Sequence, residues 1–265
     1  MEASPIPSIQ RAAVDLLTLA RDLKRRKARE RRGYFVAEGI RTTEELLRSQ
    51  LKCKGVVVSQ EFSGNPRGAS LLTSIDERGI TVLHVTETEL VSASETETPQ
   101  GILAIGEIPD RDLETLTVPA RARLLVLDAI QNPGNLGTLI RTAAAFGATA
   151  TLVLPGTVDA WNAKVVRGAM GALFRHPVIS CTWEALDVFL LRQAICLWGS
   201  DADGEPMSGV KFPERVAIAA GNEGSGLSDF ARKRVNRTIA IPIDPSVESL
   251  NVAVAAGILL YGARA

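Results

Sequence analysis

The sequence predicts an α/β fold, and two features of the chain support this prediction. Short apolar runs typical of buried strands alternate with segments that carry apolar residues at helical spacing. In the second half of the chain, polar loops rich in Gly, Asn and Pro follow the apolar runs. In α/β domains ligands bind at the carboxyl ends of strands, so we expect functional residues on these loops.

Composition narrows the classes of protein that this chain can represent. The 265 residues are 46% hydrophobic, enough for one large core or two ordinary ones. The 30 Lys and Arg residues are balanced by 30 Asp and Glu residues, so any surface that binds nucleic acid must be local. The cysteines are scattered and only His84 and His176 could join them, which argues against zinc or a disulfide framework. We expect no metal.

Neither a signal peptide nor a membrane span is expected. The apolar positions of residues 12–23 are interrupted by Asp15, Arg21 and Asp22. The longest apolar run, Val252–Tyr261, is too short to cross a bilayer. We therefore expect a cytoplasmic protein with no membrane partner.

The segment from Ser8 to about Arg32 has the apolar spacing of a helix and a strongly basic end. Lys and Arg at such density neutralise phosphates and release counterions, which indicates contact with a nucleic-acid backbone. A solvated helix face would have the same composition. The candidate nucleic-acid contacts are Lys24, Arg25, Arg26, Lys27, Arg31 and Arg32.

The next segments predict a small α/β sandwich. Strand patterns at Tyr34–Val36, Gly55–Ser59 and Thr81–Val85 alternate with helical patterns at Glu38–Ser49 and Ser70–Arg78. Prolines and charges then mark a linker. We expect a basic amino-terminal helix in residues 1–30, the small domain in 31–106, the linker in 107–120 and a larger domain in 121–265.

The larger domain begins with a strand, a polar loop and a helix within Leu124–Gly147. Asn135 is placed to cap that helix, and Arg141 follows about a turn and a half later. One helix can therefore present an amide and a guanidinium near the same loop. Ordinary turn residues and a solvated arginine would give the same pattern.

Further strands and helices follow in alternation. We expect a strand at Thr149–Leu154, helices at Asn162–Leu173 and Ala185–Leu190, a strand at Leu191–Trp198, a loop at Asp201–Pro213, strands at Val216–Ala220 and Thr238–Ile243, and a final helix after Asn251.

Two loops of this domain carry candidate ligand-binding residues. The loop from Gly221 has glycines that let backbone approach a ligand closely, and Glu223 lies at its mouth. Ser249 and Asn251 precede the final helix, where they can also act as caps. The glycine spacing does not fit a dinucleotide fingerprint, and no Walker lysine follows.

Three motifs resemble those of the SpoU branch of the SPOUT RNA methyltransferases. They are Asn-Pro-Gly-Asn-x-Gly-x-x-x-Arg-Thr-Ala from Asn132, Gly-Asn-Glu-Gly-x-Gly-Leu from Gly221, and Ile-Pro-Ile-x(5)-Ser-Leu-Asn-Val from Ile241. Their order and spacing match the family over about half of the chain. Arg31–Leu47 and Thr98–Ile105 resemble parts of the substrate-binding domain, similar to ribosomal protein L30, that many SpoU enzymes carry.

The resemblance implies a trefoil-knotted α/β domain preceded by an L30e-like domain, and a ribose 2′-O-methyltransferase that uses S-adenosylmethionine. The implied catalytic residues are Arg141, Asn135, Glu223, Ser249 and Asn251, and the implied cofactor-binding residues are Leu154, Gly221, Ile241, Pro242 and Leu250. Arg141 is often proposed as the base in this family. Because a guanidinium holds its proton, stabilising the alkoxide or gripping a phosphate suits it equally.

The family further implies a homodimer with the site at its interface, so the last helix is a candidate interface, although a core helix would look the same. RNA is the expected partner, and ribosomal RNA is favoured because the extra domain accompanies rRNA enzymes more than tRNA enzymes.

The alternatives are a tRNA 2′-O-methyltransferase and a knotted RNA-binding protein without activity. Against loss of activity stand four intact residues: Asn135, Arg141, Glu223 and Asn251. A base-methylating SPOUT enzyme would need different loops.

Overall fold

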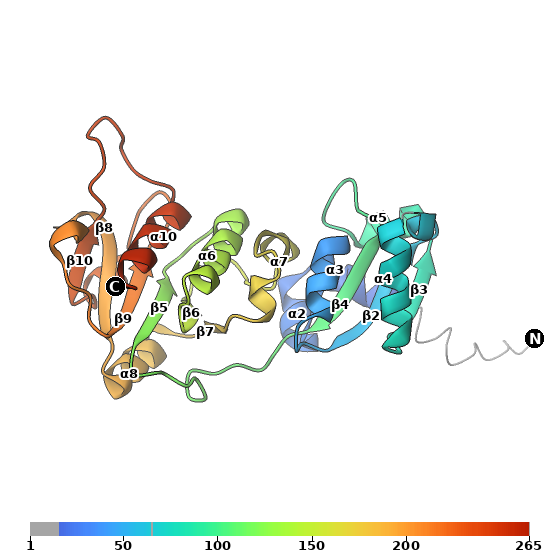
Figure 1. Cartoon of the computed structure of the whole chain (residues 1–265), viewed down its shortest axis with the longest axis horizontal. Coiled ribbons are helices and arrows are strands. Elements are labelled where there is room, and N and C mark those ends of the chain that lie inside the picture. Colours follow the sequence, from blue (N-terminus) through green and yellow to red (C-terminus); the bar gives the residue numbers. More distant parts are fainter. Residues whose placement is uncertain (1–15, 65, 265) are drawn as a thin grey trace, which may run out of the picture. The chain divides into compact units, whose positions relative to one another are not determined.

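The computed structural model describes residues 16–64 and 66–264, which form two compact units (Figure 1). The second unit comprises Asp110–Ala160 and Arg175–Ala265, and the first contains the chain up to Pro109 together with Trp161–Phe174. Within the first unit, the ring of Phe35 packs against Trp161 and Phe174, with ring centroids 4.6 and 5.5 Å apart. The returning segment thus completes the core of the first unit.

The predicted helix from Ser8 to Arg32 is helical over most of its described part, but a turn at residues 23–25 interrupts it. Residues 16–22 are helical, the chain then turns, and α2 runs Arg26–Arg32. The buried guanidinium of Arg29 holds this turn by donating to the carbonyl oxygens of Leu23 (2.7 Å) and Lys24 (2.9 Å). Residues 8–15 of the prediction lie outside the described residues.

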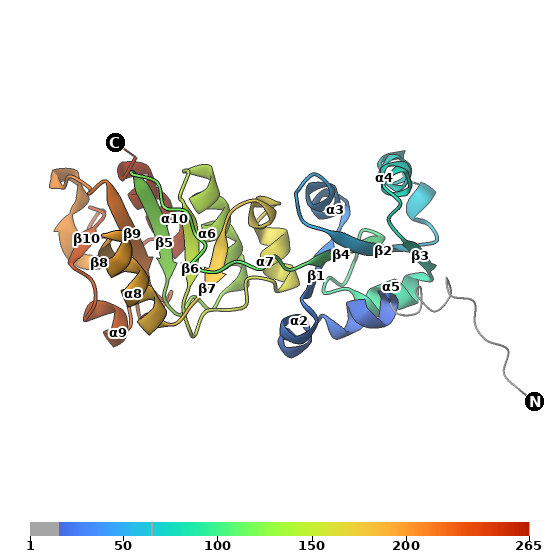
Figure 2. The ribbon, with the colours of Figure 1, turned by 90° about the horizontal axis from the view of Figure 1, so that it is seen from below.

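A four-stranded sheet separates two helical layers in the first unit. Its order is β1-β4-β2-β3, with β4 antiparallel to β1 and β2, and β2 parallel to β3. Figure 2 shows α3 and α4 on one face of the sheet and α5 on the other. The elements are β1 (Tyr34–Glu38), α3 (Ile40–Leu47), β2 (Cys53–Ser59), η1 (Phe62–Gly64), α4 (Pro66–Glu77), β3 (Val82–Val85), α5 (Glu87–Ala93) and β4 (Ile102–Glu107).

The second unit is built on six parallel strands in the order β10-β8-β9-β5-β6-β7. Side chains alternate between its faces: Leu124 and Val126 of β5 pack in one cluster with Leu186 and Phe189 of α8. The elements are β5 (Ala122–Leu127), α6 (Pro133–Ala145), β6 (Ala150–Val153), β7 (Val178–Ser180), α8 (Trp183–Gln193), β8 (Cys196–Pro206), η3 (Met207–Gly209), β9 (Arg215–Ala220), α9 (Asp229–Arg232), β10 (Arg237–Ala240) and α10 (Val252–Gly262).

Helices α6 and α10 pack against each other in the second unit (Figure 2). Gly257 permits this close crossing, because a Cβ atom there would lie 3.1 Å from Cγ2 of Thr142. The loops after β5 and β9 lie at the carboxyl ends of adjacent parallel strands, where α/β sheets bind ligands. No helix among residues 16–64 and 66–264 has the length and apolarity needed to cross a membrane.

Three further predictions of secondary structure need correction. The predicted helix Asn162–Leu173 breaks into α7 (Ala163–Gly168) and the 3₁₀ turn η2 (Ala172–Phe174), because Met170 and Gly171 between them have positive φ angles. The predicted strand Leu191–Trp198 is helical at its start, since α8 continues to Gln193. Strand β8 begins at Cys196 and extends to Pro206, into residues predicted to be a loop.

The buried His176 is a core residue of the second unit. Its Nε2 lies 2.8 Å from the hydroxyl oxygen of Thr151, and Arg111 donates to its backbone carbonyl (2.6 Å). Burial and the nearby charge of Arg111 lower the pKa of His176 to about 4. The folded protein therefore keeps this imidazole neutral at pH values where an unfolded chain would protonate it.

We expect His176 to make the free energy of unfolding increase with pH between about 4 and 6.5. The unfolded chain binds the extra proton in this range, so the slope from this residue is at most ~1.4 kcal/mol per pH unit. Urea denaturation of the wild type and of His176→Gln gives the free energy of unfolding of each protein across this pH range. The carboxyl groups contribute equally to both slopes, so the difference between the slopes is the contribution of His176. Equal slopes for the two proteins would contradict the assignment.

Candidate active site

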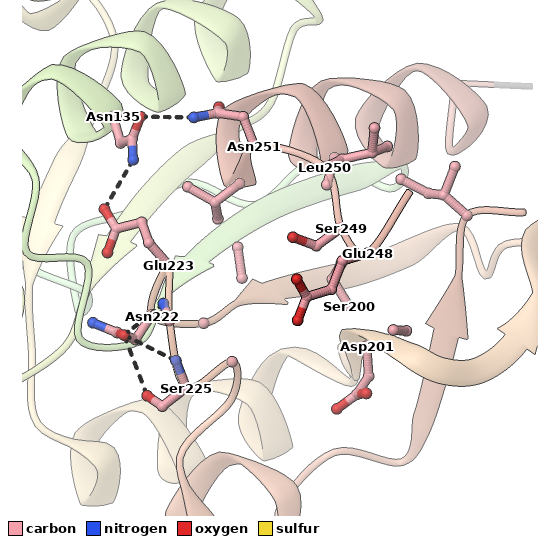
Figure 3. Close-up of a pocket in the computed structure, with 18 of the residues that line it drawn as sticks. Asn135, Ser200, Asp201, Asn222, Glu223, Ser225, Glu248, Ser249, Leu250 and Asn251 are labelled. Atoms are coloured by element: carbon pink, nitrogen blue, oxygen red, sulfur yellow. Dashed lines mark hydrogen bonds between the residues drawn. The ribbon is translucent and has the colours of Figure 1, made fainter. Parts of the chain in front are cut away.

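The loops that follow β9 and β10, together with part of β8 and the first turn of α6, surround a cavity of about 600 Å³ in the second unit (Figure 3). This volume is within the range typical of small-molecule sites. Its lining comprises Asn135 of α6, Ser200, Asp201 and Ala202 of β8, residues 220–226, Arg232, Ile241, Ile243, residues 248–252 and Ala255.

The glycine loop brings backbone to the cavity wall. A Cβ atom on Gly221 would lie 2.2 Å from the carbonyl carbon of Gly226, so only glycine lets the two ends of the loop meet. Asn222 and Gly226 exchange two backbone hydrogen bonds of 2.9 Å. The Asn222 side chain accepts from the backbone N–H of Gly224 (2.9 Å) and donates to the carbonyl of Ala129 (2.9 Å). The loop after β9 is thereby tied to the loop after β5.

Three predicted site residues form one chain of hydrogen bonds, which Figure 3 shows along the cavity wall. The Nδ2 of Asn251 donates to Oδ1 of Asn135 (3.0 Å), and the Nδ2 of Asn135 donates to a carboxylate oxygen of Glu223 (3.0 Å). Asn251 also caps α10, because its Oδ1 accepts from the backbone N–H of Ala253 (2.9 Å). This cap orients the first amide, and each amide in turn orients the next group.

The cap of α6 is Asn132, which corrects the prediction of Asn135. The Oδ1 of Asn132 accepts from the backbone N–H groups of Gly134 (2.8 Å) and Asn135 (3.3 Å), and Pro133 occupies the first helical position. The side chain of Asn135, in the first turn, is therefore free to bridge Asn251 and Glu223.

The carboxylate of Glu223 accepts hydrogen bonds from the backbone as well as from the side chain of Asn135. It faces the backbone N–H groups of Asn132 (3.2 Å) and Gln131 (3.4 Å). Partial burial would raise the pKa of Glu223, but the hydrogen bonds from Asn135, Asn132 and Gln131 outweigh burial and lower the pKa below its usual value. The side chain is thus an ionised acceptor at neutral pH.

Arg141 is not among the residues that line the cavity. It lies six residues after Asn135 on α6, which places it ~9 Å further along the helix axis and on a different side. Its side chain is exposed and has no hydrogen bond or ion pair with any residue that the structure describes. Within one chain, the amide of Asn135 and the guanidinium of Arg141 therefore do not meet at the cavity.

The implied cofactor-binding residues divide into two groups. Gly221, Ile241 and Leu250 line the cavity. Pro242 lies between two lining residues without lining the cavity itself, and Leu154 is buried at the end of β6, where its N–H donates to the carbonyl of Leu127 (3.0 Å).

Some lining residues were not predicted to belong to the site. Ser200 and Asp201 belong to the unforeseen extension of β8, and Arg232 ends α9. No sequence motif marks these three residues. Glu248, by contrast, lies within the third motif, directly before Ser249, so its position was a usable signal.

The basic segment of the first unit is partly neutralised. Arg25 and Arg32 donate to Asp22, and Arg26 is ion-paired with Glu30 at 2.7 Å. Lys24 donates to the backbone carbonyls of Ser92 and Ser94.

Of the six predicted nucleic-acid contacts, only Lys27 and Arg31 have no partner within the described parts of the chain. The described residues also contain no group of three or more His, Cys, Asp or Glu side chains placed to hold a metal ion.

Residues 122–261 match the model of the SpoU rRNA methylase family, and residues 18–104 match the MRM3-like substrate-binding domain. The chain belongs to the SpoU rRNA methylase family. It is 35% identical to the 23S rRNA (guanosine(2553)-2′-O)-methyltransferase RlmP of Bacillus subtilis, over 91% of this chain and 93% of RlmP.

Two solved structures of methyltransferases resemble the whole fold. The AviRb SpoU methyltransferase of Streptomyces viridochromogenes in complex with the cofactor AdoMet has a TM-score of 0.82 and 27% identity, covering 94% of this chain and 96% of that one. An AdoMet-bound rRNA methyltransferase of Sinorhizobium meliloti has a TM-score of 0.81 and 27% identity, with 94% of both chains covered. These matches confirm the predicted α/β fold and the family.

The double role of Asn251 can be tested by stability. We expect Asn251→Ala to lower the free energy of unfolding by ~1 kcal/mol, because α10 loses its cap. Asn251→Ser keeps a capping oxygen but cannot reach Asn135 as the amide does, so it should retain most of the stability. Urea denaturation of both variants measures this difference. An alanine variant as stable as the wild type would show that the cap contributes nothing.

Proposed function

We propose that this protein transfers a methyl group from S-adenosylmethionine to a ribose 2′-hydroxyl of ribosomal RNA. The observation that carries the proposal is the hydrogen-bonded chain of Asn251, Asn135 and Glu223 on the wall of a cavity with the volume of a small-molecule site. Membership of the SpoU family and the likeness to RlmP, named for 2′-O-methylation of 23S rRNA, support the reaction and the substrate.

The cavity suits the cofactor in volume and in chemistry. Backbone groups of the glycine loop, with Ile241 and Leu250, provide donors, acceptors and apolar surface for an adenosine and an amino-acid moiety. When bound, the cofactor supplies an electrophilic methyl group on a sulfonium. We assign its binding to Gly221, Ile241 and Leu250, the predicted residues that line the cavity.

The protein's own residues would orient the ribose and manage its proton. Asn135, Asn251 and Ser249 offer amide and hydroxyl groups to position the sugar, and ionised Glu223 holds Asn135 in one orientation. An arginine stays protonated at neutral pH, so we assign Arg141 to stabilising the developing alkoxide or binding an RNA phosphate.

A homodimer would complete this site. Val254, Ile258 and Tyr261 form an exposed apolar stripe on α10, next to Thr138 and Thr142 of α6, with a shallow groove between the two helices. Arg141 lies on α6 between these two threonines in sequence, so a second copy seated on the groove would lie beside its guanidinium. This arrangement supports a dimer as the active form.

The domain organisation follows from the same assignment. We infer that residues 31–106 select the RNA, that 107–120 act as a linker, and that 121–265 carry the reaction and the family's trefoil knot. We assign contact with the RNA backbone to Lys27 and Arg31, because the other four basic residues predicted for this role have partners among the described residues. An enzyme that modifies rRNA works where ribosomes assemble, so we place it in the cytoplasm.

The decisive experiment is transfer of tritium from labelled S-adenosylmethionine to total RNA that lacks the modification, followed by nucleoside mass spectrometry. We expect one 2′-O-methyl nucleoside in rRNA. Arg141→Ala should reduce transfer by at least ~100-fold while cofactor affinity stays nearly unchanged, since Arg141 lies outside the cavity. Label in tRNA would favour a tRNA enzyme, and cofactor binding without labelled RNA would favour a binding protein.

The dimer has its own test. Ile258→Glu places a charge on the apolar stripe, so we expect it to shift the protein from dimer to monomer and to reduce methyl transfer. Size-exclusion chromatography with light scattering measures the mass, and Leu191→Glu, on the exposed side of α8, is a matched control. A wild-type protein that is monomeric would refute the dimer.

A further inference from the structure

One acidic side chain of the cavity has no partner within the described residues. Three carboxylates line the cavity, those of Asp201, Glu223 and Glu248. Asp201 is ion-paired with Arg232, and Glu223 is held by Asn135 and by backbone N–H groups. Glu248 makes no hydrogen bond or ion pair with any described residue, and Figure 3 shows its carboxylate directed into the cavity beside Ser249.

The charges of the lining favour a cationic ligand. Arg232 is the only basic side chain among the lining residues, so three carboxylates and one guanidinium leave a net charge of −2. Walls of one sign concentrate ligand groups of the opposite sign. S-adenosylmethionine carries two cationic groups, the sulfonium and the α-ammonium of its methionine moiety.

We propose that Glu248 binds the α-ammonium group of the cofactor, an assignment that rests on the proposed function. An ammonium has N–H donors and can form charge-assisted hydrogen bonds with a carboxylate, whereas a sulfonium has none. A carboxylate beside the sulfonium would also stabilise a positive charge that disperses as the methyl group leaves, which would slow the reaction. Glu248 is therefore a cofactor-binding residue that anchors the methionine moiety.

Comparing three ligands shows whether Glu248 binds the ammonium or the sulfonium. S-adenosylmethionine has both, S-adenosylhomocysteine has only the ammonium, and 5′-methylthioadenosine has neither. Titration calorimetry of the full chain should show that Glu248→Gln weakens binding of the first two ligands by a similar factor, about 3- to 10-fold. Binding of 5′-methylthioadenosine should not change.

The control is Asp244→Asn, which removes the same charge from the same loop at a position that does not line the cavity. It should leave the affinity for all three ligands unchanged. Weaker binding of S-adenosylmethionine alone would make Glu248 a partner of the sulfonium and overturn the proposal. Equal weakening of all three ligands, or no weakening, would overturn it as well.

The two proposals fail separately. A wild-type protein that binds none of the three ligands would refute the proposed function. A wild-type protein that binds the cofactor and methylates RNA, with unchanged affinity in Glu248→Gln, would refute only the role of Glu248.

Discussion

The hydrogen bonds from Asn251 through Asn135 to Glu223 join three segments that are far apart in the sequence. Each member has a second contact that limits its freedom: Asn251 caps α10, Asn135 follows the cap of α6, and Glu223 accepts backbone N–H groups of the loop after β5. The ends of two helices and the glycine loop are therefore coupled. A shift of any one of them would leave a polar group without its partner.

The parallel sheet makes this coupling possible. Because β5 and β9 are adjacent and parallel, their following loops emerge at the same edge, and the loop after β10 returns to it before α10. Gly221 and Asn222 then fold the loop after β9 against itself and against Ala129. The glycine loop thus contributes backbone to the cavity wall, and the four charged side chains of the lining are the strongest determinants of the charge of a ligand that it binds.

Local patterns were enough to predict most strands and helices but failed where tertiary contacts override them. The helix expected through Arg32 is interrupted because Arg29 bonds to carbonyls of the preceding turn, which no periodicity reveals. Helix α5 was not predicted, although Thr86 and Glu89 form a capping box that is visible as a sequence pattern. Strand β8 continues through polar residues because Glu205 and Pro206, at its end, pair with Ile239 and Ala240 of β10.

The sequence by itself determined the α/β class, the family and the polar residues of the motif loops. Each of these follows from the spacing of residues within one loop or one helical turn, which can be read directly from the sequence. Only the tertiary structure decided how these residues meet. It showed that Asn132 caps α6 and leaves Asn135 free, and that Arg141 lies outside the cavity of its own chain. It also showed that Glu248, an exposed residue, lines the cavity without a partner among the described residues. The contact between Asn135 and Asn251 joins side chains 116 residues apart, and the cap by Asn132 depends on the backbone geometry at the start of α6. A linear pattern contains neither.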